Sequence, residues 1–304
     1  MRAEIEKAVT LLQTGNPAAM DQALALLQST VFNFSMKVCG SREDAEDTMQ
    51  EVLLRSIRYL PRFDSPRALA VWLYKVARSR CLMSRRRSKF APKENLSLEN
   101  LLPDRRELSS LAPASASRPR DGETPESTLL RGEDARRLQE AVRRLPPDYR
   151  VILILHDMEQ LSAGEIAKIT ALKPGTVRVR LHRARLFVRR ELAGKNGRRA
   201  PKLGRKPTVA HAAKTALPRS GRCKAMFAEI SNYLDDALDD ALCEQLEKHM
   251  DGCEPCKAFL ASLEDTVRQC KQTPDIQPDK RRAAQLREKL LAEYRGALAG
   301  RAGV

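Results

Sequence analysis

Three side chains that commonly bind metals lie close together in the C-terminal third of the sequence. His249 is followed by Cys253, and Cys256 comes after the intervening Glu254-Pro255. Two thiolates and an imidazole suit a tetrahedral zinc site, in which four ligands make a closed structural centre. A reduced Cys-x-x-Cys pair without metal is the alternative, and a thioredoxin-like role is disfavoured because no βαβ pattern surrounds the pair. The spacing therefore predicts Zn²⁺ binding and requires a fourth ligand.

Residues 147–193 have the pattern of a helix-turn-helix. Ser162 and Glu165 have the form of a capping box, and Leu161 and Ile166 stand where a hydrophobic staple would stand, so a short helix is expected over 163–170. Residues 171–173 would make the turn. Pro174 suits the first position of the next helix, because its missing N–H costs nothing there.

The helix expected over 174–193 has a narrow apolar face. Its members recur at helical spacing: Val177, Leu181, Ala184 and Val188. The rest of the helix is cationic, with Val179 as an apolar exception. Arginine can bond guanine bidentately in the major groove, and an aliphatic side chain can meet a thymine methyl. A solvated basic helix is the alternative. We predict DNA contacts here from Thr176, Arg178, Val179, Arg180, His182 and Arg183.

A second basic stretch lies earlier in the chain. Six basic residues and no acidic ones occur between Arg78 and Lys89, and Trp72 and Tyr74 stand at the head of the same expected helix. Aromatic rings can stack on bases while the cations bind phosphates, so this combination is typical of nucleic-acid binding. Packing of Trp72 in the core is the alternative.

Composition agrees with a nucleic-acid partner. The 304 residues include 55 Lys and Arg against 39 Asp and Glu, for a formal net charge of +16. Such an excess favours polyanions, and the length indicates roughly two domains. The longest aliphatic run, residues 151–155, is far too short to cross a bilayer, and no secretory leader is evident. We therefore expect a cytoplasmic protein without membrane insertion. No phosphate-binding loop or catalytic triad signature is evident, so no enzymatic activity is expected.

Apolar spacing of three and four residues predicts an all-α fold. Helices are expected over 3–14, 18–39, 42–60, 66–88, 132–145, 147–159, 163–170, 174–193, 223–237, 240–250, 254–270 and 279–298. The predicted modules are 1–90, 131–193 and 222–270, followed by a helical tail over 271–304. Residues 91–130, rich in Ser, Ala and Pro, and residues 194–221, basic and without an acidic residue, are expected to be linkers. Cys39 and Cys81 are expected in the core.

Two blocks of the sequence resemble bacterial RNA polymerase sigma factors of the extracytoplasmic-function (ECF) type. The first contains AEDTMQEVLLRSIRYLPRF, which is similar to region 2.2, and WLYKVARSRCLMSRRR, which is similar to regions 2.3 and 2.4. The second, LPPDYRVILILHDMEQLSAGEIAKITALKPGTVRVRLHRARLFVRREL, is similar to region 4. The resemblance covers about residues 20–90 and 132–193, in the family's order.

The resemblance implies roles for particular residues. Asp47, Gln50 and Glu51 match positions that hold the β′ clamp helices of core RNA polymerase, and region 4 implies contact with the β flap. The loop over 61–67 matches the one that captures a flipped base of the −10 promoter element, an extrusion that needs a pocket and stacking. The helix over 174–190 matches the reader of the −35 element. The expected −10 contacts are Phe63, Trp72, Lys75, Arg78, Arg80, Arg85, Arg86 and Arg87.

Residues 223–256 resemble the zinc-binding domain of anti-sigma factors. In that family an upstream cysteine completes the ligand set, which makes Cys223 the expected fourth ligand and Cys243 the alternative. Residues 223–270 carry eleven acidic and four basic residues, whereas both expected DNA-reading segments are positive. We therefore expect this module to fold back on the sigma modules and restrain them, in a metal- or redox-dependent way. The alternative is a passive structural staple.

The sequence therefore predicts a transcription initiation factor whose partners are core RNA polymerase and promoter DNA. A stand-alone helix-turn-helix regulator with a structural zinc site is the alternative function. The family's usual residues are replaced at Met83-Ser84, Lys173 and Val179, which affects the promoter sequence that is read rather than the class of protein.

Overall fold

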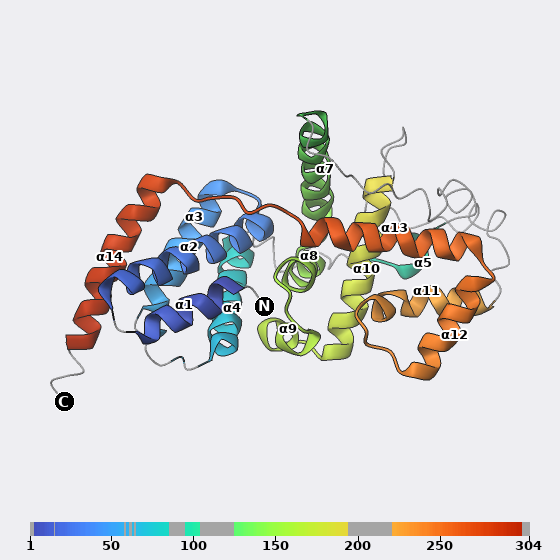
Figure 1. Cartoon of the computed structure of the whole chain (residues 1–304), viewed down its shortest axis with the longest axis horizontal. Coiled ribbons are helices and arrows are strands. Elements are labelled where there is room, and N and C mark those ends of the chain that lie inside the picture. The colour runs from blue at the N-terminus through green and yellow to red at the C-terminus, as the bar shows by residue number, and fades with distance from the viewer. Residues whose placement is uncertain are drawn as a thin grey trace. The chain divides into compact units, whose positions relative to one another are not determined.

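Figure 1 shows a computed structural model of the chain, which describes residues 3–14, 16–57, 59–60, 63, 65–84, 95–103, 125–193 and 221–299. Within these ranges, the side chains at 17, 84, 125–131, 221–225, 228 and 295–299 are left undescribed. The described secondary structure is helical and contains no strand, which confirms the all-α prediction. None of the described helices is both long and apolar enough to span a membrane.

The helices follow one another along the chain with short connections. Their bounds are α1 (Ala3–Gln13), α2 (Pro17–Cys39), α3 (Arg42–Ser56), α4 (Pro66–Ser84), α5 (Leu98–Leu101), α7 (Pro125–Arg144), α8 (Pro147–Leu153), the π-helix η3 (Ile154–Met158), α9 (Ala163–Thr170), α10 (Pro174–Ala193), α11 (Gly221–Leu234), α12 (Asp240–Asp251), α13 (Glu254–Lys271) and α14 (Lys280–Ala299).

Capping residues account for where several of these helices begin. The side chains of Asn16, Ser41 and Asp239 accept hydrogen bonds from the first turns of α2, α3 and α12. The predicted capping box of α9 is present in full. The helix α2 ends at Gly40, whose φ of 74° is the left-handed conformation that glycine adopts at low cost.

The structure departs from the predicted helices in three places. The short helix α5 lies within the segment that was expected to be a linker, and α7 begins at Pro125 rather than near residue 132. The single helix expected over 147–159 widens into the π-helix η3 after Leu153. Apolar spacing alone does not distinguish these helix types, because a π turn changes the register by only one residue.

The chain divides into two compact units. The first comprises the described parts of residues 1–92, 150–177 and 274–304, and the second comprises those of residues 93–149 and 178–273. These units differ from the consecutive modules predicted above. Residues 150–177 group with the N-terminal helices, as does α14, and residues 178–193 of α10 group with the helices α11–α13.

The core of the first unit lies among α1, α2, α3 and α4. Phe34 of α2 and Tyr74 of α4 pack edge to face with their ring centroids 4.9 Å apart. Cys39 and Cys81 are buried, as predicted, and the structure adds that they form a disulfide between α2 and α4. A buried Glu159, which follows η3, accepts a hydrogen bond of 2.6 Å from the Tyr74 hydroxyl and pairs with Lys37 at 3.4 Å.

The core of the second unit joins α11, α13 and the larger part of α10. Phe227 of α11 and Phe259 of α13 pack edge to face, with ring centroids 4.8 Å apart. The guanidinium of Arg189, from α10, lies 4.2 Å from the centroid of the Phe259 ring. This cation–π contact places a helix-turn-helix residue against the cysteine-containing helices.

Candidate nucleic-acid interface and metal centre

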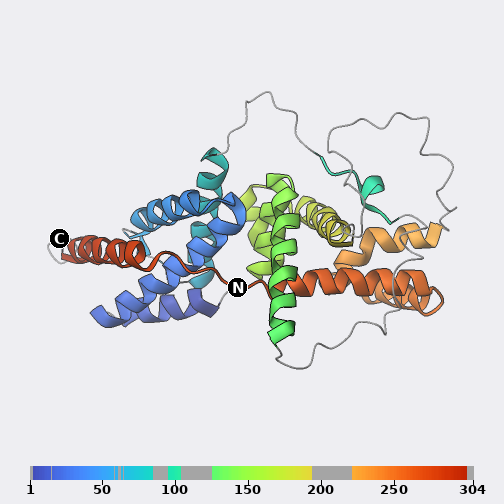
Figure 2. The same ribbon diagram turned by 90° about the horizontal axis from the view of Figure 1, so that it is seen from above.

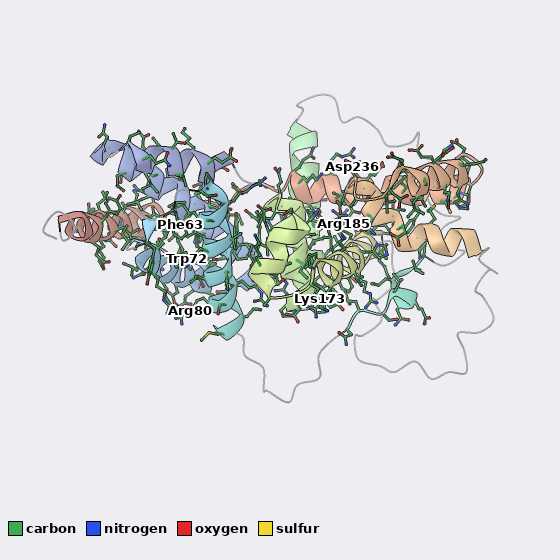
Figure 3. All side chains as sticks on the ribbon, turned by 90° about the horizontal axis from the view of Figure 1, so that it is seen from below. Phe63, Trp72, Arg80, Lys173, Arg185 and Asp236 are labelled. Atoms are coloured by element: carbon green, nitrogen blue, oxygen red, sulfur yellow. A yellow bond between two sulfur atoms is a disulfide. The ribbon has the colours of Figure 1, made fainter. Side chains whose placement is uncertain are left out.

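An aromatic cluster lies at the start of α4. The ring of Trp72 lies 6.1 Å, centroid to centroid, from the rings of both Tyr59 and Phe63. Trp72 and Phe63 are half-buried, whereas Tyr59 is 45 % exposed. Sequence reasoning selected Phe63 and Trp72 but missed Tyr59. The cluster brings three stacking surfaces together, two of which come from the loop before α4 (Figure 3).

The cations of α4 differ in how accessible they are. Lys75 is exposed, Arg78 is half-buried, and the exposed Arg80 donates from Nε to Glu51 at 2.6 Å. An exposed pair of this kind contributes little to stability and can be exchanged for phosphate contacts. The remaining predicted cations, Arg85, Arg86 and Arg87, lie outside the described residues.

The predicted polymerase contacts lie on α3. Asp47 and Gln50 are exposed, and Glu51 is half-buried. Besides Arg80, Glu51 binds Arg55 one helical turn further on, at 2.5 Å. The structure therefore presents Asp47 and Gln50 at the surface but engages Glu51 with two arginines.

The first turns of α10 are accessible. Thr176 and Arg178 are exposed, and Val179 is 50 % exposed. The apolar stripe of α10 is buried as predicted, so these residues point away from it. In helix-turn-helix proteins the N-terminal residues of the second helix contact base edges. The accessible part of α10 is therefore the part that such a helix uses.

The second half of the predicted reading face is occupied within the protein. Arg180 packs over the ring of Tyr149, and Arg183 donates to the carbonyl oxygen of Leu96 at 3.1 Å. His182 was expected to contact a phosphate or a base, but the structure buries it, with Nδ1 2.9 Å from Ser231 Oγ of α11. Burial, reinforced by nearby arginines, lowers the pKa of His182 to about 4. A DNA contact by this histidine is therefore closed in this conformation.

Two further arginines of α10 bind the helices after it, and sequence reasoning missed both. Arg185 is 1 % exposed and donates both terminal nitrogens to the carboxylate of Asp235, at 2.8 and 2.9 Å (Figure 3). Arg189 donates to Ser262 Oγ of α13 at 3.1 Å. Their available signal was position: with His182 they lie on one flank of α10, and the net-acidic residues 223–270 offer the opposite charge.

The predicted metal ligands come together where α12 meets α13. His249 lies in the last turn of α12, Cys253 caps the N-terminus of α13, and Cys256 lies in its first turn. Their ligand atoms all lie within 4.8 Å of one another. Two sulfurs and one imidazole nitrogen at this separation fit a tetrahedral zinc ion. The side chain of Cys223 is not described, and Cys243 is not part of the group.

Comparison with known proteins matches three segments of the chain. Sigma-70 region 2 matches residues 24–90, sigma-70 region 4 matches residues 135–188, and a zinc-finger family matches residues 223–257. The two sigma-70 matches contain the α4 and α10 surfaces, and the third contains all the predicted metal ligands.

Several sigma factors are similar to the chain over its first two-thirds. The ECF RNA polymerase sigma factor SigW of Bacillus subtilis is 27 % identical over 192 residues, which are 63 % of this chain and 98 % of that protein. The ECF RNA polymerase sigma factor SigE of Mycolicibacterium smegmatis is 30 % identical over 184 residues, which are 59 % and 65 % of the two chains. With regions 2 and 4 in order, the chain belongs to the ECF-type RNA polymerase sigma factors of the sigma-70 family and carries a C-terminal zinc-finger segment.

Proposed function

We propose that this sigma factor binds core RNA polymerase through the surface of α3 around Asp47, Gln50 and Glu51, and through region 4 at the β flap. On promoter DNA, α4 reads the −10 element and the N-terminal turns of α10 read the −35 element. The clustered Tyr59, Phe63 and Trp72 rings supply stacking surfaces for an extruded base. Its energetics are those of binding and strand opening, without catalysis of its own, in the cytoplasm where polymerase acts.

We further propose that the C-terminal segment holds Zn²⁺ through His249, Cys253 and Cys256, with Cys223 as the fourth ligand. The match to a zinc-finger family and the proximity of the three described ligands support this assignment. The metal would fix the junction of α12 and α13. That junction sets the position of α13, whose Ser262 and Phe259 contact Arg189 of α10.

The zinc-finger segment restrains region 4 in cis. The observation that carries this proposal is the bidentate pair between Arg185 and Asp235, which ties the −35 reading helix to α11. His182 and Ser231 add a second link. Charges buried in this way are stable only while both partners stay in place, so region 4 and the zinc-finger segment are expected to separate together or not at all.

Run-off transcription tests both parts of the proposal. Core RNA polymerase is combined with either the full chain or a chain that ends at residue 220, on promoters selected from genomic fragments. The proposal expects factor-dependent transcripts with both chains and more transcript with the shorter one. Transcripts from neither chain, together with failure to co-purify with core polymerase, would refute the sigma activity. Equal transcription by both chains, with and without a zinc chelator, would refute the restraint. A stand-alone regulator is not favoured, because region 2 accompanies region 4.

A further inference from the structure

The C-terminal helix α14 is amphipathic and basic, and no role has so far been assigned to it. Its apolar residues recur at three- and four-residue intervals on one face, and all are buried: Ala283, Leu286, Leu290 and Tyr294. Its polar residues include six basic and two acidic side chains between residues 280 and 299. A helix of this kind needs an apolar surface to cover and an acidic one to face.

Both surfaces are provided by region 2, in the same compact unit as α14. The helix packs against α2 and α3 (Figures 1 and 2). The buried amide of Gln28 donates to the carbonyl oxygen of Ala283 at 2.9 Å, and Arg287 donates to Gln28 Oε1 at 3.2 Å. Just before the helix, the backbone N–H of Ile276 donates to the buried Asn33 at 2.6 Å. Buried polar groups of α2 are thus satisfied by the C-terminal segment.

The contact with α3 involves the expected polymerase-binding surface. Arg282 binds the carboxylate of Glu46, which is 7 % exposed and also pairs with Arg42. One pocket is lined on one side by Asp47 and Gln50, and on the other by residues of α14. The α14 residues that line it are Arg282, Gln285, Leu286 and Lys289. Between residues 42 and 56, α3 carries five acidic and two basic residues, so the two helices are complementary in charge.

We propose that α14 is an intramolecular competitor for core RNA polymerase. It occupies the acidic face of α3 as a basic helix of the polymerase would, and it must leave before that face can bind. A helix with its side chains is about 10 Å across, so a second helix cannot lie on Asp47 and Gln50 while α14 remains there. This inference rests on the proposed polymerase contacts of α3. It concerns region 2 and is separate from the zinc-finger restraint on region 4.

The test compares two acidic substitutions on α14 in the full chain. Leu290→Asp places a charge in the buried face, whereas Ala292→Asp places the same charge on the exposed face as the matched control. Affinity for core RNA polymerase is measured by fluorescence anisotropy of the labelled sigma factor. If the surface is open one tenth of the time, release of α14 lowers the apparent Kd about tenfold. We expect that change for Leu290→Asp and none for Ala292→Asp.

A second variant keeps the apolar face intact. Arg282→Glu removes the Glu46 pair and sets like charges against each other, and it should also tighten polymerase binding. Hydrogen exchange supplies an independent readout, because α14 should lose protection when core polymerase binds. Unchanged affinity in both variants, with α14 still protected in the complex, would overturn the inference while leaving the sigma activity standing. A chain that binds core polymerase in none of its forms would overturn the proposed function, and this inference with it.

Discussion

The pair between Arg185 and Asp235 offers the sharpest test of how the zinc-finger segment holds region 4. Asp235→Asn keeps the shape of the side chain and removes its charge, which leaves the guanidinium of Arg185, 1 % exposed, without its counter-ion. Breaking a buried pair costs about 3–5 kcal/mol. Because the Asp235 side chain is 20 % exposed, water recovers part of this, and we expect about 2–3 kcal/mol. That shifts the balance between docked and released zinc-finger segments by about 30- to 150-fold.

Hydrogen exchange and transcription measure the two consequences. Amides of α11 and α13 should exchange faster in Asp235→Asn, and run-off transcription should increase. Asp236→Asn is the matched control, because Asp236 is the next residue, is exposed, and adopts a positive φ of 49° that asparagine also tolerates. Equal exchange in the two variants would show that the pair does not hold the segments together. Faster exchange without increased transcription would show that docking does not restrain the sigma factor.

Three further predictions concern pH, oxidation and metal. Because docking lowers the pKa of His182 from 6.5 to about 4, its contribution is complete above pH 6.5 and is lost as the pH falls; at pH 5 the loss is about 2 kcal/mol. Hydrogen exchange of α11 at pH 7 and pH 5 should show this loss in the wild type and a smaller one in His182→Gln. The disulfide between Cys39 and Cys81 closes a loop with a sequence separation of 42, and its reduction should destabilise region 2 by up to about 4 kcal/mol, measured by urea unfolding with and without dithiothreitol. A double Cys→Ser variant that unfolds like the oxidised wild type would contradict this. Cys256→Ser should abolish stoichiometric zinc in a metal assay and lower the Tm of the C-terminal segment, and unchanged zinc content would exclude this ligand.

Local sequence patterns were sufficient for most of the secondary structure. The start of α9 follows from Ser162 and Glu165, which are three residues apart and form their capping box without help from the rest of the chain. The start of α10 at Pro174 follows equally from the neighbouring backbone. His249, Cys253 and Cys256 converge because a helix end and a helix start bring them together across a short connection. These features involve residues close in sequence, so their spacing carries the information.

Contacts between distant residues were decided only by the tertiary structure. Arg185 and His182 look like any other polar residues of a basic helix until α11, nearly fifty residues later, buries them. The expected tail was recognised as a helix, but its apolar face does not name the surface that it covers. The disulfide likewise depends on how α2 packs against α4. Periodicity determines which residues share a face, because the helix repeat is local. Which faces meet is decided by complementary shape, charge and burial across the whole chain.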